Sequence, residues 1–227
     1  MVSSGVSSSS SSNAAARNRS RQAPAWVRAG FWLCILIALA AAGRRFVVIL
    51  RPTAAPTPQM QALDSYFSSH AALTLAHIIP ATLFVLVTPF VFLERFRKSR
   101  WPERLLFPLG FVVAGTAYAM STDSVGGWTE RSAVLFFNTL FLVSLARALA
   151  LARRGAAEEE RRWLTRAVGI LLGIATTRPV MGVFFATSRL THLEPRQFFG
   201  IAFWIGFSIN TLAVELWLRS RSTEARI

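Results

Sequence analysis

The sequence contains few acidic residues and a single cysteine. Aspartate and glutamate total 11 of 227 residues against 25 lysines and arginines, so the formal net charge is +14. Cys34 alone excludes an internal disulfide and any metal or haem attachment that needs paired cysteines. The basic residues, almost entirely arginine, lie in short clusters between apolar runs instead of along one polar face. This distribution argues against nucleic-acid binding and is typical of the loops of membrane proteins.

The sequence also lacks the motifs of common enzymes. We find no phosphate-binding glycine loop, no nucleophile elbow, no zinc-ligand spacing and no pair of carboxylates placed for acid and base chemistry. It therefore offers no candidate catalytic or metal-binding residue, and it favours a protein that is not an enzyme.

Apolar residues are abundant and occur in long runs. They make up 53% of the chain, with 18 Phe and 7 Trp, and the mean hydropathy is +0.43. Each run is long enough, at about 1.5 Å per residue, to cross a hydrocarbon core of roughly 30 Å. We expect transmembrane spans at about residues 26–43, 69–93, 105–121, 132–152, 166–187 and 197–218. The predicted fold is thus an all-α polytopic membrane helix bundle with six transmembrane helices in one domain, residues 26–218.

The charge of the loops predicts the orientation of the bundle. Basic loops alternate with weakly charged ones from the second span onward, which places the N-terminus and the C-terminus in the cytoplasm. Residues 1–25 are predicted to be a disordered tail rich in Ser, Ala and Arg, and residues 219–227 a cytoplasmic tail. Arg44 and Arg45 fall on the outer side and break this rule, and the prolines after Arg51 predict an extended loop over residues 51–59. The first apolar segment also permits a second interpretation, a cleaved signal peptide.

Several short motifs resemble a family of predicted bacterial membrane proteins known as domain of unknown function 2306. The matching residues are His77-Ile78, Gly126-Gly127-Trp128, Arg161-Arg162-Trp163-Leu164-Thr165-Arg166, Thr177-Arg178, Asn210 and Glu215. The resemblance covers about residues 69–218 and implies a multi-pass protein of the bacterial cytoplasmic membrane, without implying an activity. Two histidines typical of the family are missing, because Glu160 and Arg100-Trp101 occupy their positions.

A polar cluster around Arg178 is the candidate ligand-binding site. Counting residues from the predicted outer ends places Arg178 at a depth of roughly 13–15 Å, His77 at about 10 Å and Asn138 at about 9 Å, with Tyr118 shallower. A guanidinium in hydrocarbon costs about 2.5 kcal/mol or more, so Arg178 must find acceptors in protein, water or a ligand. We expect no carboxylate there, since all acidic residues lie in loops or near helix ends.

Two interpretations of this cluster remain open at this point. In one, Arg178 in an outward-facing pocket binds an anionic or carbonyl-bearing ligand, such as a quinone head group, a lipid phosphate or a small carboxylate. In the other, Arg178 only ties helices together by donating to backbone carbonyls freed by Pro80 or Pro179. The first interpretation predicts a binding or transport module, or an accessory subunit of a larger membrane complex.

A membrane redox protein is the alternative function. His70 and His192, both near the outer surface, are candidate ligands of a haem, and a quinone is the other candidate cofactor. Near the cytoplasmic surface we expect Arg147 to pair with Glu215, and Glu158 to Glu160 to be solvated surface charge. The basic cytoplasmic loops are expected to attract anionic lipids of the bilayer.

Overall fold

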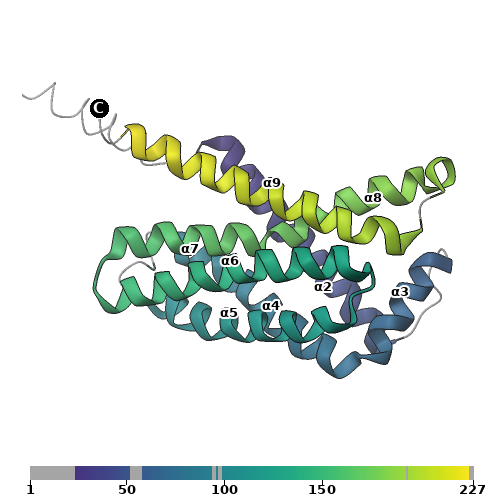
Figure 1. The fold of residues 1–227 in the computed structure, drawn as a ribbon. Coiled ribbons are helices and arrows are strands. Elements are labelled where there is room, and N and C mark those ends of the chain that lie inside the picture. The colour runs from purple at the N-terminus through teal and green to yellow at the C-terminus, as the bar shows by residue number, and fades with distance from the viewer. Residues whose placement is uncertain (1–23, 52–57, 94–95, 97–98, 193, 225–227) are drawn as a thin grey trace, which may run out of the picture. The chain divides into compact units, whose positions relative to one another are not determined.

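A computed structural model describes residues 24–51, 58–93, 96, 99–192 and 194–224 of the chain. Their regular structure is entirely helical (Figure 1). The elements are α2 (Ala25–Leu50), α3 (Pro58–Ser69), α4 (Ala71–Phe92), α5 (Trp101–Met120), the 3-10 helix η2 (Ser121–Asp123), α6 (Gly127–Arg153), α7 (Ala157–Leu171), α8 (Gly173–Thr191) and α9 (Pro195–Glu224). The predicted disordered tail lies almost wholly outside the described residues.

The chain divides into two compact units, residues 1–33 and residues 34–227. In the first unit, the described residues form the opening turns of α2, where the rings of Phe31 and Trp32 meet edge to face at 5.6 Å between centroids. The second unit contains the rest of α2 and every later helix. All of the packing described below lies within this second unit.

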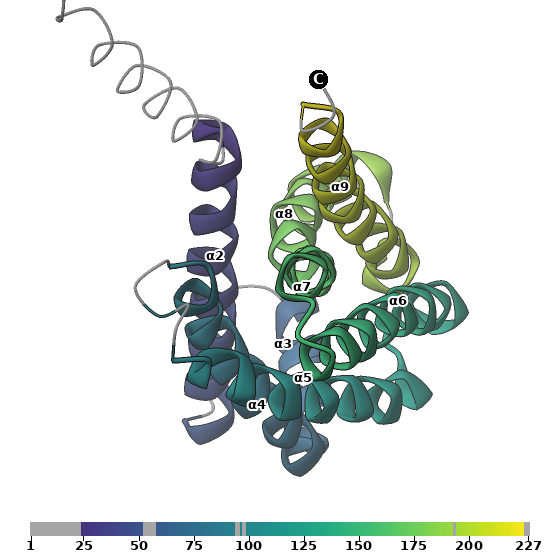
Figure 2. The same cartoon turned by 90° about the vertical axis from the view of Figure 1, so that its left-hand side faces the viewer.

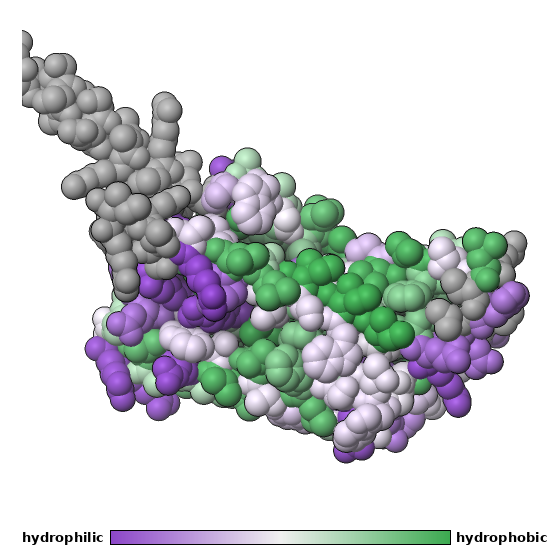
Figure 3. All heavy atoms as spheres, turned by 45° about the horizontal axis from the view of Figure 1, so that its top comes forward, coloured by the Kyte–Doolittle hydropathy of each residue, from purple (hydrophilic) through white to green (hydrophobic). Residues whose placement is uncertain are grey.

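Six helical segments of the described residues are long and apolar enough to cross a membrane, which confirms the predicted number. They are Ala25–Leu50, Ala71–Phe92, Trp101–Asp123, Gly127–Arg153, Ala157–Thr187 and Arg196–Arg221. Apolar side chains cover the middle of the face in Figure 3, and hydrophilic ones gather towards its ends. A surface of this kind is suited to lipid instead of water, so the chain is a multi-pass membrane protein.

Neighbouring helices of the second unit pack in pairs. Helix α4 lies against α5, α6 against α7, and α8 against α9, and α9 also covers parts of α6 and α7 (Figure 2). The fifth span is broken at Leu172, where α7 ends and α8 begins. Beyond this break, α9 comes so close to α8 that a Cβ atom at Gly206 would lie 2.6 Å from the backbone nitrogen of Thr177. Glycine at this position lets the two backbones meet beside Arg178.

Some helix bounds differ from those expected from the sequence. Helix α3 begins at Pro58, so the loop expected over residues 51–59 contains the first two residues of a helix that the apolar pattern did not predict. Proline is favourable there, because the first turn of a helix does not use its backbone N–H groups. Helix α9 extends to Glu224, beyond the predicted end of the last span at Leu218. Helix α4 continues through Pro80 and Pro89, as the expected span over residues 69–93 requires.

Candidate functional site: a cavity lined by Arg178

A cavity of about 480 Å³ lies within the second unit, between the later part of α2, helix α3 and the helices from α4 to α9. Most of its lining is apolar, with contributions from Ile78, Phe137 and Phe203 among others. Its charged and polar lining includes Arg44, Arg45, Asp64, Tyr66, His70, His77, Asp123, Glu130, Asn138 and Arg178. Three arginines therefore face three carboxylates, so the formal charge of these six side chains sums to zero.

Arg178 lies in α8, one residue before Pro179, and its side chain lines the cavity. Its Nε is buried and has no hydrogen-bond acceptor among the described residues. A buried donor without an acceptor costs about 1–3 kcal/mol, and more when the group is charged. Through this Nε, Arg178 therefore makes no hydrogen bond to a backbone carbonyl of the described residues.

The carboxylate of Glu130, in the first turn of α6, also lines the cavity. It is 8% exposed, and it accepts a hydrogen bond of 2.7 Å from the backbone nitrogen of Gly126. Glu130 attracts the charge of Arg178, while Arg44 and Arg45 repel it. The expectation that no carboxylate lies near Arg178 was wrong, because Glu130 at the end of a helix is folded inward against the cavity.

A second charged group joins α2 to α3. Arg44 donates to both carboxylate oxygens of Asp64, at 3.1 and 2.7 Å, and Arg45 donates to Oδ1 at 2.9 Å. The guanidinium of Arg45 also lies 4.1 Å from the ring centroid of Phe67. These two arginines broke the charge rule in the sequence, and their pairing with α3 explains how they are accommodated. In the sequence, the signal for these two cavity-lining residues was their position on the outer side, where the charge rule predicts few basic residues.

Two further residues predicted to be in the polar cluster line the cavity with Arg178. His77 Nδ1 lies 2.9 Å from the hydroxyl oxygen of Thr116, and Asn138 donates through Nδ2 to the carbonyl of Ala114 at 2.9 Å. Thr116 itself donates to a backbone carbonyl of α5, so its oxygen is free to accept from His77. Both side chains are thus anchored to α5.

The other predicted residues are placed differently. Tyr118 is not among the described residues that line the cavity, and its hydroxyl lies 2.7 Å from that of Thr139. His70 lines the cavity, with Nδ1 at 3.1 Å from the hydroxyl of Ser69, whereas His192 is exposed after α8 and does not line it. The structure therefore does not bring His70 and His192 together in this cavity.

Tyr66, on α3, is a lining residue that sequence reasoning did not select. Burial raises the pKa of its phenol, and the negative charges of Asp123 and Glu130 raise it further. The phenol therefore stays protonated at neutral pH and keeps a hydrogen-bond donor. No periodic apolar pattern marks α3 in the sequence, which is why Tyr66 was overlooked.

Two expected charge arrangements at the other end of the bundle were wrong. Glu215 pairs with Arg166 at 2.9 Å and with Arg219 at 3.2 Å, while Arg147 lies over the ring of Trp163. The spacing of four residues between Glu215 and Arg219 on α9 favours that local pair.

Glu160 is the second case. It is 4% exposed, and both of its carboxylate oxygens accept from Arg100 Nη2, at 3.0 and 2.8 Å. It is therefore an interior ion-pair partner and not solvated surface charge. The hydrogen bond to Glu103 and the charge of Glu160 raise the pKa of Arg100, which therefore remains fully charged.

Comparison with known proteins gives one match. The model of a family described as a predicted membrane protein, DUF2306, matches residues 74–218, which include most of α4, all of the helices from α5 to α8 and most of α9. No curated protein and no solved structure matches the chain.

Proposed function

We propose that this chain, which belongs to the DUF2306 family of predicted membrane proteins, is a non-enzymatic binding module. Its ligand is a small lipid-soluble molecule whose head group carries carbonyl or carboxylate oxygens. The observation that carries the proposal is the buried Nε of Arg178, which lies at the wall of a cavity and has no acceptor in the part of the chain that the structure describes. The planar fork of a guanidinium is suited to such oxygens.

The charge of the lining narrows the class of ligand. Asp64, Asp123 and Glu130 balance the three arginines, so a phosphate with two negative charges would enter a lining that has no excess positive charge. A carbonyl-bearing head group, such as that of a quinone, needs hydrogen-bond donors from the protein but no counter-charge. The apolar remainder of the lining is suited to rings or an aliphatic chain.

We place this binding site towards the outer surface of the membrane. The support is the distribution of charge in the sequence, since the basic loops lie at the opposite ends of the helices. Binding is the step common to a transport module and to an accessory subunit of a larger complex. The haem alternative has weaker support, because only one of its two candidate histidines lines the cavity.

The experiment is binding of a short-chain benzoquinone to the purified full-length protein in detergent, with thermal unfolding as the readout. The variant is Arg178→Leu, and the matched control is Arg131→Leu. Arg131 also has a buried Nε without an acceptor among the described residues, but it does not line the cavity. We expect the quinone to raise the unfolding temperature of the wild type and of Arg131→Leu but not of Arg178→Leu.

Two results would contradict the proposal. One is equal stabilisation of all three proteins, which would place any bound quinone in the micelle or elsewhere on the surface. The other is the absence of stabilisation by quinones and by fatty carboxylates alike, together with unchanged stability of Arg178→Leu. An optical spectrum of the same sample tests the haem alternative, which requires a Soret band lost in His70→Ala.

A further inference from the structure

A shallow groove separate from the cavity lies between α5 and α6. It has a volume of about 490 Å³ and is lined by Arg100, Glu103, Arg104, Phe107, Pro108, Phe111, Leu149, Ala152 and Arg153. None of these side chains lines the cavity that contains Arg178. The groove therefore needs an explanation of its own.

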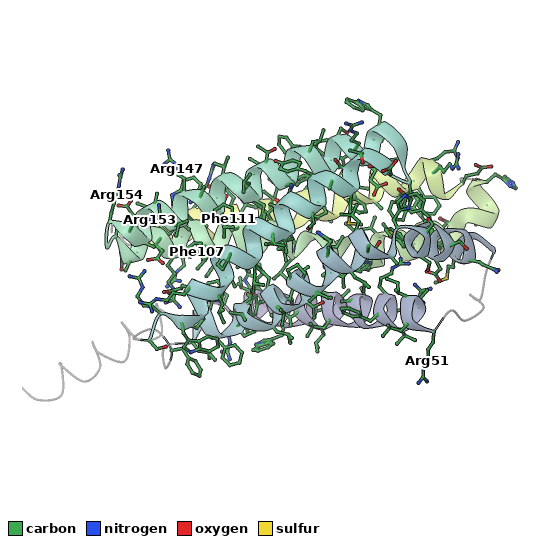
Figure 4. The ribbon with its side chains drawn as sticks, turned by 90° about the horizontal axis from the view of Figure 1, so that it is seen from below. Arg51, Phe107, Phe111, Arg147, Arg153 and Arg154 are labelled. Atoms are coloured by element: carbon green, nitrogen blue, oxygen red, sulfur yellow. The ribbon has the colours of Figure 1, made fainter. Side chains whose placement is uncertain are left out.

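The groove is polar at one end and apolar along its length. Arg104 and Arg153 lie at the start of α5 and the end of α6, which meet at the same end of the bundle. Figure 4 shows Arg153 at that end, with Phe107 and Phe111 progressively farther from it. At about 1.5 Å per residue, Phe111 lies roughly 10 Å beyond Arg104 along α5. Such an arrangement matches a phosphate head group followed by an acyl chain.

Among the described residues, two of the three arginines that line the groove, Arg104 and Arg153, have no carboxylate partner. Arg100 is paired with Glu103 and Glu160, which accounts for both of these carboxylates. In the part of the chain that the structure describes, no carboxylate forms an ion pair with Arg104 or Arg153, and both are exposed. Two unpaired cations beside an apolar floor at the membrane surface attract an anionic lipid.

We infer that this groove binds one anionic glycerophospholipid, with its phosphate at Arg104 and Arg153 and an acyl chain along Phe107, Phe111 and Leu149. A free phosphate ion would use the arginines but not the apolar floor. A zwitterionic lipid would fill the floor but would be held less strongly by the two cations. An anionic phospholipid therefore differs from a free phosphate ion and from a zwitterionic lipid, because it alone uses both the two arginines and the apolar floor of the groove.

The test is displacement of a fluorescent phosphatidylglycerol from the purified full-length protein in detergent micelles. In Arg104→Gln/Arg153→Gln we expect binding to weaken by about 30-fold, since each arginine near an anionic lipid contributes roughly a factor of five. The matched control, Arg51→Gln/Arg196→Gln, removes the same charge at the opposite end of the bundle, where Figure 4 places Arg51. We expect the control to bind within about threefold of wild type.

The apolar floor is tested separately by Ala152→Phe, which fills the groove and leaves both arginines in place. We expect it to prevent binding of phosphatidylglycerol, and Leu149→Ala to weaken it. Unlabelled phosphatidylglycerol should displace the probe, whereas phosphatidylcholine and inorganic phosphate should not. The unfolding temperature of each variant is measured without lipid, so that loss of binding is read only from folded protein.

Four outcomes would overturn the inference. Equal loss of binding in the groove variant and the control would show diffuse attraction to a basic protein. Equal displacement by phosphatidylcholine would show that the negative charge of the lipid does not contribute to binding. Displacement by inorganic phosphate would show that the acyl chain does not contribute. Unchanged binding in folded Ala152→Phe would exclude the groove itself.

Discussion

Replacing Gly206 with alanine is expected to disturb the contact that holds Arg178 in place. A Cβ atom at Gly206 would lie 2.6 Å from the backbone nitrogen and from Cγ2 of Thr177, and 2.8 Å from its Cα. Real Cβ atoms essentially never come within 3.0 Å of a heavy atom outside their own residue and its neighbours along the chain. Thr177 is fully buried and immediately precedes Arg178, so α8 itself must move.

The size of the effect follows from two opposing contributions. Overpacking of a filled interior costs about 1–3 kcal/mol, while alanine is favoured over glycine inside a helix by about 0.5–1 kcal/mol. The net loss in the free energy of unfolding is therefore about 0–2.5 kcal/mol, with a central value near 1 kcal/mol. For a chain of this size the central value corresponds to a fall in the unfolding temperature of roughly 2–4 °C.

The matched control is Gly115→Ala on α5, where an added Cβ meets nothing within 4 Å. It gains the helix preference without the clash, so its unfolding temperature should stay the same or rise slightly. The assay is thermal unfolding of both variants in the same detergent, followed by quinone binding. If Gly206→Ala were as stable as Gly115→Ala and bound quinone equally well, the close approach of α8 and α9 would play no part in forming the site.

Two ion pairs give further predictions. Asp64→Asn removes the negative charge that pairs with both Arg44 and Arg45, so we expect the free energy of unfolding, measured with denaturant, to fall by about 1–3 kcal/mol. We also expect the quinone to raise the unfolding temperature less than in the wild type. An unchanged effect of the quinone would show that this ion pair is not part of the binding site. Glu160→Gln leaves Arg100 without its buried counter-charge, so we expect the free energy of unfolding to fall by about 1–3 kcal/mol while quinone binding stays intact. If quinone binding were lost together with stability, this ion pair would not be independent of the cavity at the other end of the bundle.

The helices could be predicted from the sequence because hydrocarbon imposes a length and a composition on each span. The depth of a residue is similarly accessible, since each residue advances a helix by about 1.5 Å. This count led to Arg178, His77 and Asn138, which the structure places around one cavity. The direction of a side chain is harder to predict, because helices that are apolar on all sides carry no strong signal of which face is inward. Tyr118 was selected by depth and lies outside the lining for this reason.

The carboxylates were missed because their partners are distant in sequence. Asp64 lies in α3, whose composition is mixed, and its contact with Arg44 depends on how α3 folds back beside α2. Glu130 was assigned to an outer loop, but α6 begins at Gly127 and buries it in the first turn. A count along the chain gives no information about such contacts between helices.

The partners of the arginines distinguish structural positions from binding positions. Arg45 and Arg166 each have a carboxylate within 3 Å, which explains their place at a helix contact. Arg178 lies at a helix contact as well, yet its Nε lacks an acceptor among the described residues, and the carboxylate of Glu130 influences it without forming an ion pair. A side chain that served only to join helices would be expected to satisfy its own donors, because an unmet buried charge weakens the contact it makes. Arg131 has a similar unmet Nε among the described residues but does not line the cavity, so the argument for a ligand is the unmet donor of Arg178 together with its place in the cavity lining.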